Sequence, residues 1–342
     1  MHSSLEVFYR EGHSLNTAFL GTGRALPLHS VDSIDLDRKW DAGGRIAAAG
    51  VRRRFYCKDE MQVDLATVAC QRALQNAGRK IDEIDLIISG ASVPYQPIPA
   101  MAPLVMRRLG MADGTAAAFD VNSTCLSFVT GLDIGSRMIS GGAATTALVV
   151  SSEVASRALP WAQHPETAAL FGDGAAAAVL GASTGQTSAA IKAVRLRSFP
   201  SAYEACGIGA GGTRFDFNAE HAAFAEHSKF SMDGKALFRL TTLHFSGFVD
   251  ALLQEAGWDH ADVDLIVPHQ ASPAALDHMI RQTGWPKEKV VRIVEDYGNQ
   301  IAASIPFAFD IARELGRVPA GSKVLFLGTS AGVSLGGAAV VT

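Results

Sequence analysis

The chain has 342 residues, of which 48% are hydrophobic and 19% are charged, and its formal net charge is −4 at pH 7. This length exceeds one ordinary hydrophobic core, so we expect two domains or two halves, and the slightly acidic balance gives no reason to expect a nucleic-acid partner. No run of 18 uninterrupted apolar residues predicts a membrane span, and the N-terminus lacks the basic and apolar segments of a secretory signal, so we expect a cytoplasmic protein.

The four cysteines show no CxxC or CxxH spacing: Cys57, Cys70, Cys125 and Cys206. We therefore expect neither a metal site nor a disulfide framework, and the thiols should stay reduced. Cys70 falls within a helical pattern and is expected to be a buried apolar side chain. Cys57 is expected to be structural or on the surface.

In chain order, the first long helix is expected over residues 65–78, with Asp64 as its N-cap and Gly78 as its stop. Short apolar runs then alternate with helical segments, and such runs are typical of strands buried on both faces. Residues 201–233 carry glycines, aromatic residues and histidines with weak periodicity, which indicates a long functional loop or insertion. The expected strands cover residues 85–90, 117–121, 147–152, 175–181, 264–269, 290–294, 323–328 and 336–341.

The order of elements repeats about halfway along the chain. Residues 73–92 and 252–272 both read as a helix, an Ala-Gly stop, a short acidic turn and an Asp-led strand. The strands TALVVSSE and KVLFLGTS, at residues 146–153 and 323–330, repeat at nearly the same offset. Two matches in the same order predict a duplicated α/β unit. We expect the halves to cover residues 1–185 and 186–342, with the seam in the small polar residues 181–192.

Cys125 stands where the expected strand 117–121 gives way to a helix. In the other half, His269 ends the strand 264–269 and Asn299 precedes a helix, so all three fall where α/β sheets place their sites. A thiol at a helix start is expected to favour the thiolate, and an imidazole can take up its proton. An amide can donate a hydrogen bond to an oxyanion. The three residues together predict a nucleophilic site.

The segments that hold these residues resemble the thiolase-fold condensing enzymes, and within them the β-ketoacyl-[acyl-carrier-protein] synthase III family. FDVNSTCLSF carries Cys125, VPHQAS carries His269 and GNQIAAS carries Asn299. GTGRALP, GVRRRFY, FGDGAAAAVLG and the closing GTSAGVSLGGAAVV resemble further family segments, so the resemblance runs through nearly the whole chain. It implies a thiolase-like α/β fold of two duplicated halves related by a pseudo-twofold axis, in five layers, α-β-α-β-α.

The resemblance also implies a condensing acyltransferase that needs no cofactor beyond its thioester substrates, acyl-CoA and acyl carrier protein. Cys125 would take the acyl group, and His269 and Asn299 would stabilise the enolate formed when a malonyl thioester loses CO2. The product would be a 3-oxoacyl thioester. The backbone N–H groups of Cys125 and Ala331 would hold the oxyanion of the tetrahedral intermediate. Members of the family are homodimers.

Several positions depart from the family pattern. Ala274 and Ala48 stand where the family has arginines that receive the carrier protein and CoA, and Trp40 and Arg45 are near the CoA positions but out of register. These departures indicate a specialised relative, and they leave open whether CoA or a carrier protein brings each acyl group. Ile98 lies in a loop that limits chain length across the dimer in the family, and it is our candidate for the acyl pocket.

Three alternatives remain open at this point. A non-condensing acyltransferase on the same fold would pass an acyl group from Cys125 to an alcohol, an amine or a carrier, and Ala274 slightly favours it. A catalytically silent partner subunit would have no reason to keep the Cys, His and Asn. A thiol protease or hydrolase would use the same three residue types, but FGDGA and the closing strand point elsewhere.

Overall fold

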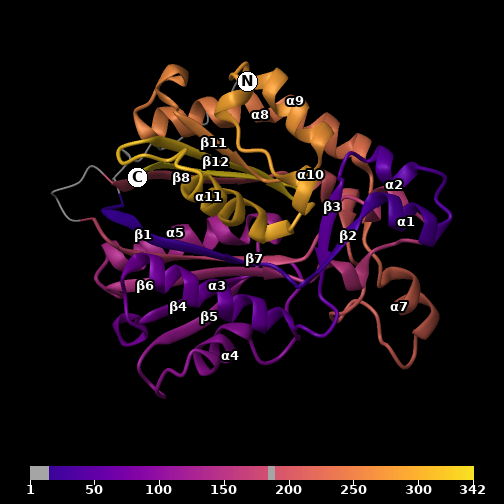
Figure 1. Ribbon diagram of the computed structural model, residues 1–342, viewed down its shortest axis with the longest axis horizontal. Coiled ribbons are helices and arrows are strands. Elements are labelled where there is room, and N and C mark those ends of the chain that lie inside the picture. The colour runs from indigo at the N-terminus through magenta and orange to yellow at the C-terminus, as the bar shows by residue number, and fades with distance from the viewer. Residues whose placement is uncertain (1–14, 184–188) are drawn as a thin grey trace, which may run out of the picture.

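The computed structural model describes residues 15–183 and 189–342, and two mixed β-sheets form its framework (Figure 1). The strand order of the first sheet is β1-β7-β6-β4-β5. β4 runs parallel to β5 and β6, whereas β7 runs antiparallel to β6 and β1. The strands of this sheet are β1 (Thr17–Ala25), β4 (Leu86–Gly90), β5 (Ala117–Val121), β6 (Thr146–Glu153) and β7 (Gly174–Ala182).

The second sheet repeats this order with strands from the other half of the chain. Read from the equivalent edge, its order is β8-β13-β12-β11. β11 is parallel to β12, and the other neighbours are antiparallel, as in the first sheet. The topology therefore confirms the predicted duplication. The strands are β8 (Ala190–Ser198), β11 (Leu265–Pro268), β12 (Lys323–Ser330) and β13 (Ser334–Val341).

The predicted strand over residues 290–294 is wrong. Only Val290 bridges to β11, and the helix α10 (Val294–Tyr297) begins at the end of the segment. The buried side chain of Gln270 explains the difference, because its amide oxygen accepts the N–H groups of Ile293 and Val294 at 2.9 and 3.2 Å. These backbone groups are satisfied by a side chain instead of a neighbouring strand. The expected boundary between the halves, at residues 185 and 186, lies outside the described residues.

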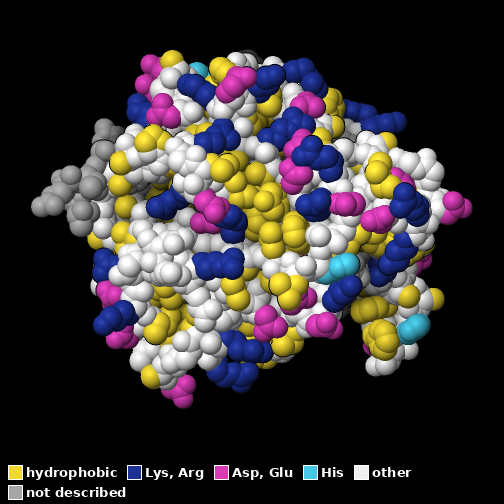
Figure 2. Space-filling model, viewed as in Figure 1, with side chains coloured by type: hydrophobic (Ala, Val, Ile, Leu, Met, Phe, Trp, Pro, Cys, Tyr) yellow, Lys and Arg dark blue, Asp and Glu magenta, His cyan; other side chains and the backbone are white. Residues whose placement is uncertain are grey.

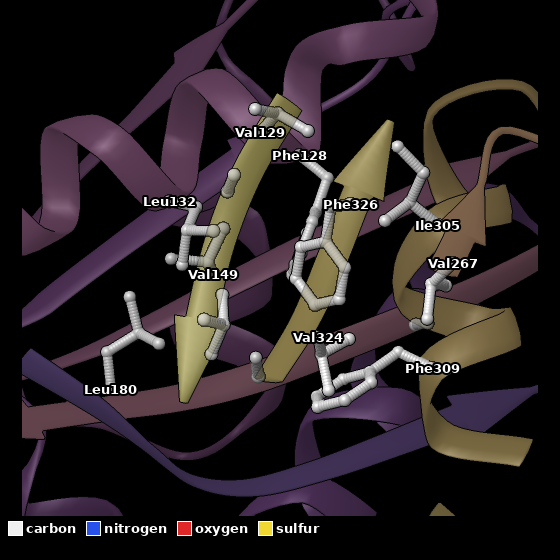
Figure 3. Packing of buried hydrophobic residues seen from close by; sticks show 14 of the residues in the cluster. Phe128, Val129, Leu132, Val149, Leu180, Val267, Ile305, Phe309, Val324 and Phe326 are labelled. Atoms are coloured by element: carbon white, nitrogen blue, oxygen red, sulfur yellow. The ribbon is translucent and has the colours of Figure 1, made fainter. Parts of the chain in front are cut away.

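Two central helices, α5 (Ser127–Ser140) and α11 (Ser304–Glu314), lie between the sheets (Figure 1). Alternate residues of each strand point toward these helices, so that Val149 of β6 and Phe326 of β12 belong to one buried cluster (Figure 3). The residues between them point to the opposite faces and form two further clusters. The central strands are therefore buried on both faces, as the continuous apolar runs predict, whereas the edge strand β5 is partly exposed.

Outer helices cover those opposite faces and complete the five layers α-β-α-β-α. α3 (Gln62–Ala77) and α4 (Met101–Arg108) pack on the first sheet. α8 (Gly234–Ala256) and α9 (Pro273–Thr283) pack on the second. The predicted thiolase-like architecture is confirmed, with α5 and α11 as the shared middle layer.

The start of α3 differs from the prediction. Asp64 is not the N-cap, because the helix begins at Gln62 and Asp64 already lies in its first turn. There the Asp64 carboxylate accepts the N–H of Met61 at 3.0 Å, which satisfies one of the free donors of the helix start. Gly78 ends the helix with a left-handed φ of 61°, as predicted.

Shorter elements complete the described chain. The segment predicted as a long loop, residues 201–233, contains one short helix and two paired two-residue strands. Another antiparallel pair, β2 and β3, flanks two short helices. The bounds are β2 (His29–Asp32), α1 (Ser33–Trp40), α2 (Arg45–Ala48), β3 (Arg53–Tyr56), α6 (Pro165–Ala168), β9 (Cys206–Gly207), α7 (His221–His227) and β10 (Ser231–Met232).

Charges of both signs are mixed on the molecular surface. On the face shown in Figure 2, Lys and Arg side chains alternate with Asp and Glu side chains. Within residues 15–183 and 189–342, no helix combines the length and the apolar character that crossing a bilayer requires.

Phe326 provides a test of the middle layer. Its ring is fully buried and packs edge-on against Phe19 and Phe309 at centroid distances of 5.9 and 5.0 Å. We predict that Phe326→Ala lowers the free energy of unfolding by about 3–5 kcal/mol, because it removes buried apolar area and leaves a cavity between the sheets. Urea denaturation measures this change.

The matched control is Leu315→Ala, whose side chain is 69% exposed. It should change the free energy of unfolding by no more than about 0.5 kcal/mol. If Phe326→Ala cost as little as this control, the described packing of the middle layer would be wrong.

Candidate active site

One cavity gathers residues from both halves of the chain. Its volume is about 570 Å³, and it is lined by Cys125 from the first half and by His269, Asn299 and Ala331 from the second. The structure thus brings together the four residues that the sequence singled out for nucleophile, hydrogen-bonding groups and oxyanion site. Apolar side chains build much of the wall around them: Leu159, Leu170, Phe171, Phe230 and Ile301. A separate open hollow beside α8 contains none of the predicted residues.

A tight turn between β5 and α5 places Cys125 at the cavity. The side-chain oxygen of Asn122 accepts the N–H of Thr124 at 2.9 Å, and Thr124 adopts a left-handed φ of 51°. The hydroxyl of Ser127 then accepts the N–H of Ser123 at 3.0 Å. Cys125 follows in a 3-10 turn, η2 (Thr124–Leu126), that leads directly into α5. Its own backbone N–H is therefore one of the free donors of a helix start.

The second half builds the same turn at the equivalent place in the repeat. Asn299 accepts the N–H of Ile301 at 2.8 Å, Ile301 has a φ of 51°, and Ser304 accepts the N–H of Gln300 at 3.1 Å. Its 3-10 turn, η7 (Ile301–Ala303), contacts η2. The two helix starts therefore meet, as the predicted pseudo-twofold relation requires. The sequence carried this signal, because Asn122 and Asn299 are separated by the same offset as the strands TALVVSSE and KVLFLGTS.

The turn also fixes the orientation of the Asn299 amide. Its oxygen accepts the N–H of Ile301 and lies 3.3 Å from the hydroxyl of Ser304. The amide nitrogen makes a long contact of 3.4 Å to the carbonyl of Ala271. The oxygen is committed to the turn, so the N–H side is the one available to a ligand in the cavity.

His269 is an uncharged imidazole at the end of β11. Its side chain is buried, and its backbone N–H donates to the carbonyl of Leu327 at 2.7 Å. Burial lowers the pKa of His269 to about 4. Its Nδ1 has no hydrogen-bond partner among the described residues. A neutral ring can accept a proton at one nitrogen and donate at the other.

The thiol of Cys125 is also neutral in the free protein. Burial is the main cause that raises its pKa to about 12, and the charges of Glu153 and Cys206 act in the same direction. The backbone N–H groups of Ala331 and of Cys125 itself lower the pKa. The backbone donors of the helix start do favour the thiolate, as expected, but burial outweighs them in the free site.

Two residues near the thiol carry more weight than the sequence indicated. Glu153, at the end of β6, is fully buried, and burial raises its pKa to about 8. Cys206, in β9, lines the same cavity as Cys125. The repeat shows that Glu153 and Ser330 occupy equivalent positions in the two halves. Nothing in the sequence showed that the Glu153 carboxyl would be buried beside the thiol.

Other predicted residues lie elsewhere. Ile98 is 86% exposed and does not line the cavity of its own chain. Trp40 stacks on Trp161 at 5.8 Å, and Arg45 forms an exposed ion pair with Glu166. None of these side chains meets Cys125 in the described chain.

Two residues of the segment FGDGAAAAVLG have structural positions beside the cavity, and Cys70 is buried as expected. Asp173 accepts hydrogen bonds from the backbone of Cys57 and Ser156, both at 2.9 Å, and so joins two loops beside the cavity. Phe171 contributes to the cavity wall. Cys70 is fully buried. In residues 15–183 and 189–342, no group of three or more His, Cys, Asp or Glu side chains is arranged to hold a metal ion.

The outer part of the cavity comes from the segment after β8. Tyr203, Glu204, Arg214 and His227 line it, and Arg214 is the only lysine or arginine among the described lining residues. The guanidinium of Arg214 lies 5.3 Å from the ring centre of Phe215. It forms no ion pair with a carboxylate of the described chain, so its charge is available to a ligand.

Comparisons with known proteins show which family the chain resembles. The family model for 3-oxoacyl-[acyl-carrier-protein] synthase III matches residues 119–200, and the model for its C-terminal part matches residues 253–342. The β-ketoacyl-[acyl-carrier-protein] synthase III 3 of Streptomyces coelicolor is 36% identical, over 94% of this chain and 95% of that protein. The synthase III of Neisseria meningitidis serogroup A is 35% identical, over 92% and 96%. The crystal structure of 3-oxoacyl-(acyl carrier protein) synthase III from Pseudomonas aeruginosa is 31% identical, covers 96% of this chain and 98% of that chain, and has a TM-score of 0.85.

The buried imidazole predicts an acid-dependent loss of stability. Because the pKa of His269 falls from 6.5 to about 4 on folding, the unfolded chain binds more protons between these values. Stability therefore decreases as the pH falls through this window. We predict that His269→Gln reduces the loss of unfolding free energy between pH 7.5 and pH 5 by about 2 kcal/mol, measured by urea denaturation.

His164→Gln serves as the control, because the His164 side chain is 64% exposed. This variant should lose as much stability on acidification as the wild type. An equal loss in His269→Gln and wild type would contradict the burial of a neutral imidazole.

Proposed function

This chain belongs to the 3-oxoacyl-[acyl-carrier-protein] synthase III family, and on that premise we propose that it catalyses a decarboxylative condensation between an acyl group held on Cys125 and a malonyl thioester. The observation that carries the proposal is the convergence of Cys125, His269 and Asn299 on one cavity. The first lies at a helix start of one half, and the other two come from the second half.

In the loading step, the sulfur of Cys125 attacks the carbonyl carbon of an acyl thioester. His269 is unprotonated at neutral pH, and we propose that it accepts the thiol proton as the sulfur attacks. The backbone N–H groups of Cys125 and Ala331 are proposed to bind the oxyanion. The tetrahedral intermediate then expels the carrier thiol, which leaves with a proton, and the acyl group stays on Cys125.

In the condensing step, the malonyl thioester loses CO2 and leaves an enolate. An N–H of His269 and the amide N–H of Asn299 are proposed to donate hydrogen bonds to the enolate oxygen. The enolate carbon attacks the acyl carbon, and the Cys125 sulfur departs. A 3-oxoacyl thioester forms, and protonation returns the free thiol. The committed oxygen of Asn299 supports this role, because the amide can only present its donor side.

We further propose that two copies of the chain assemble into a homodimer through β5. This strand is an edge of its sheet, and Phe119 and Val121 on it are partly exposed. An unpaired edge with apolar side chains is suited to pair with a second copy. The exposed Ile98 would then meet the acyl group of the partner.

We also propose that the halves of each copy cover residues 1–185 and 186–342. The proposed compartment is the cytoplasm, where thiols stay reduced.

Intact-protein mass spectrometry tests the function directly. We predict that incubation with a panel of acyl-CoA or acyl-carrier-protein substrates adds one acyl mass to the wild type and none to Cys125→Ala. Addition of a malonyl thioester should then discharge the adduct, release CO2 and yield the 3-oxoacyl product.

The outcome also separates the competing functions. An adduct that survives the malonyl thioester but leaves with an alcohol or an amine would establish the non-condensing acyltransferase instead. If neither carrier labels Cys125, the proposed nucleophile is wrong.

Arg214 predicts how the donor is held. Because family arginines are missing at Ala48 and Ala274, we expect the unpaired guanidinium of Arg214 to contact a phosphate of the CoA or carrier arm. We predict that Arg214→Ala raises the KM for acyl-CoA about fivefold, a modest effect because the side chain is exposed. The KM for the matching acyl-N-acetylcysteamine thioester, which has no phosphate, should not change.

The control is Arg197→Ala, since Arg197 is exposed but does not line the cavity. It should leave both KM values unchanged. If Arg214→Ala raised the KM for both thioesters by the same factor, Arg214 would only support the cavity wall.

A further inference from the structure

Glu153 occupies an unusual position at the meeting point of the two helix starts. It is the last residue of β6, pairs with Gly174 of β7, and is 0% exposed. One carboxyl oxygen accepts the N–H of Ser92 at 2.6 Å. The other, Oε2, has no hydrogen-bond partner within the described residues. A fully buried carboxyl with one oxygen unsatisfied is costly and calls for an explanation.

The internal repeat shows what this carboxyl faces. Ala302 is the counterpart of Cys125, and Ser330 is the counterpart of Glu153, at the same offset along the chain. β6 contacts η7, and the backbone N–H of Ala302 acts on the Glu153 carboxyl. The second helix start therefore presents the N–H of Ala302 to an internal carboxyl, without forming a hydrogen bond to Oε2, whereas the first presents the N–H of Cys125 to its own thiol.

The Glu153 carboxyl and the Cys125 thiol also interact electrostatically. η2 and η7 are in contact, and the charge of Glu153 acts directly on the Cys125 sulfur. Cys206 from β9 is the other titratable group that acts on this sulfur. His269, after β11, faces the same cavity, and Tyr203, Glu204, Arg214 and His227 line its outer part. Glu153 is the fully buried carboxylic acid among these groups, whereas Glu204 is exposed.

We propose that Glu153 is a positioning residue that controls the ionisation of Cys125. In its protonated form it leaves the thiol free to release its proton during acyl loading. In its ionised form it places a negative charge beside the site and opposes the thiolate. The meaning for loading rests on the proposed function, but thiol ionisation itself can be measured without any acyl substrate.

The buried position sets the pH at which this control operates. Burial raises the pKa of Glu153 to about 8, so the carboxyl is mainly protonated at pH 6.5 and ionised at pH 9.5. Removing the charge should therefore matter only at the higher pH. A purely structural role would change the reactivity of Cys125 by the same factor at every pH.

The test is the rate of alkylation of Cys125 by iodoacetamide in full-length protein, followed by peptide mass spectrometry. We expect Glu153→Gln to react at about the wild-type rate at pH 6.5 and about tenfold faster at pH 9.5, since one pKa unit corresponds to tenfold more thiolate. Glu153→Asp retains a carboxyl and should stay close to the wild type. Glu288→Gln, the same change on an exposed residue, is the matched control and should have no effect.

A rate ratio between Glu153→Gln and wild type that is the same at both pH values would overturn the proposal. Should Glu153→Gln fail to fold, the wild-type profile decides. The wild-type alkylation rate should rise tenfold per pH unit, with a plateau near pH 8 if Glu153 controls the thiol. A constant slope through pH 8 would overturn the proposal. None of these readings depends on acyl loading, so failure here leaves the proposed condensation standing.

Discussion

The contact between two buried helix starts is the constraint on which the rest of the molecule depends. α5 and α11 fill the layer between the sheets, and the 3-10 turns that precede them touch each other. This contact forms only if the strand β5 of the first sheet and the segment before η7 in the second half end close to each other. The shared strand order, the paired Asn turns and the positive φ of Thr124 and Ile301 place them there. Non-glycine residues adopt such φ values at a cost, and surrounding packing must hold them there.

Burial at this contact also determines the chemistry that is open to the site. Desolvation keeps Cys125 as a thiol and His269 as a neutral imidazole. Under the proposed function, the Cys125 thiol must therefore give up its proton during the reaction. In a thiolate–imidazolium pair, that proton would already have moved to the imidazole. Because the thiolate is the reactive form, the raised pKa also lowers the reactivity of Cys125 toward electrophiles in the free protein.

Local sequence patterns were sufficient for most of the framework, and they singled out three residues that the fold brings to one cavity. Continuous apolar runs fixed most of the strands, and the repeat offset revealed the duplication. Features that depend on tertiary burial were not accessible in this way. The amide of Gln270 replaces a strand at residues 290–294, and the burial of Glu153 arises only when β6 meets η7. The net shift in the Cys125 pKa was not accessible for the same reason, since a helix start is visible in a sequence and desolvation is not.

The origin of the cavity wall has a consequence for how such proteins diversify. Tyr203, Arg214, His227 and Phe230 all come from the segment between β8 and α8, which has no counterpart strand in either main sheet. Cys125, His269 and Asn299, in contrast, are anchored in the repeated framework. Insertions, deletions and substitutions in this segment can reshape the cavity wall while these three residues stay in place. Under the proposed function, substrate range and reaction chemistry would lie in separable parts of the chain, so related proteins could change their acyl substrate and keep the same catalytic residues.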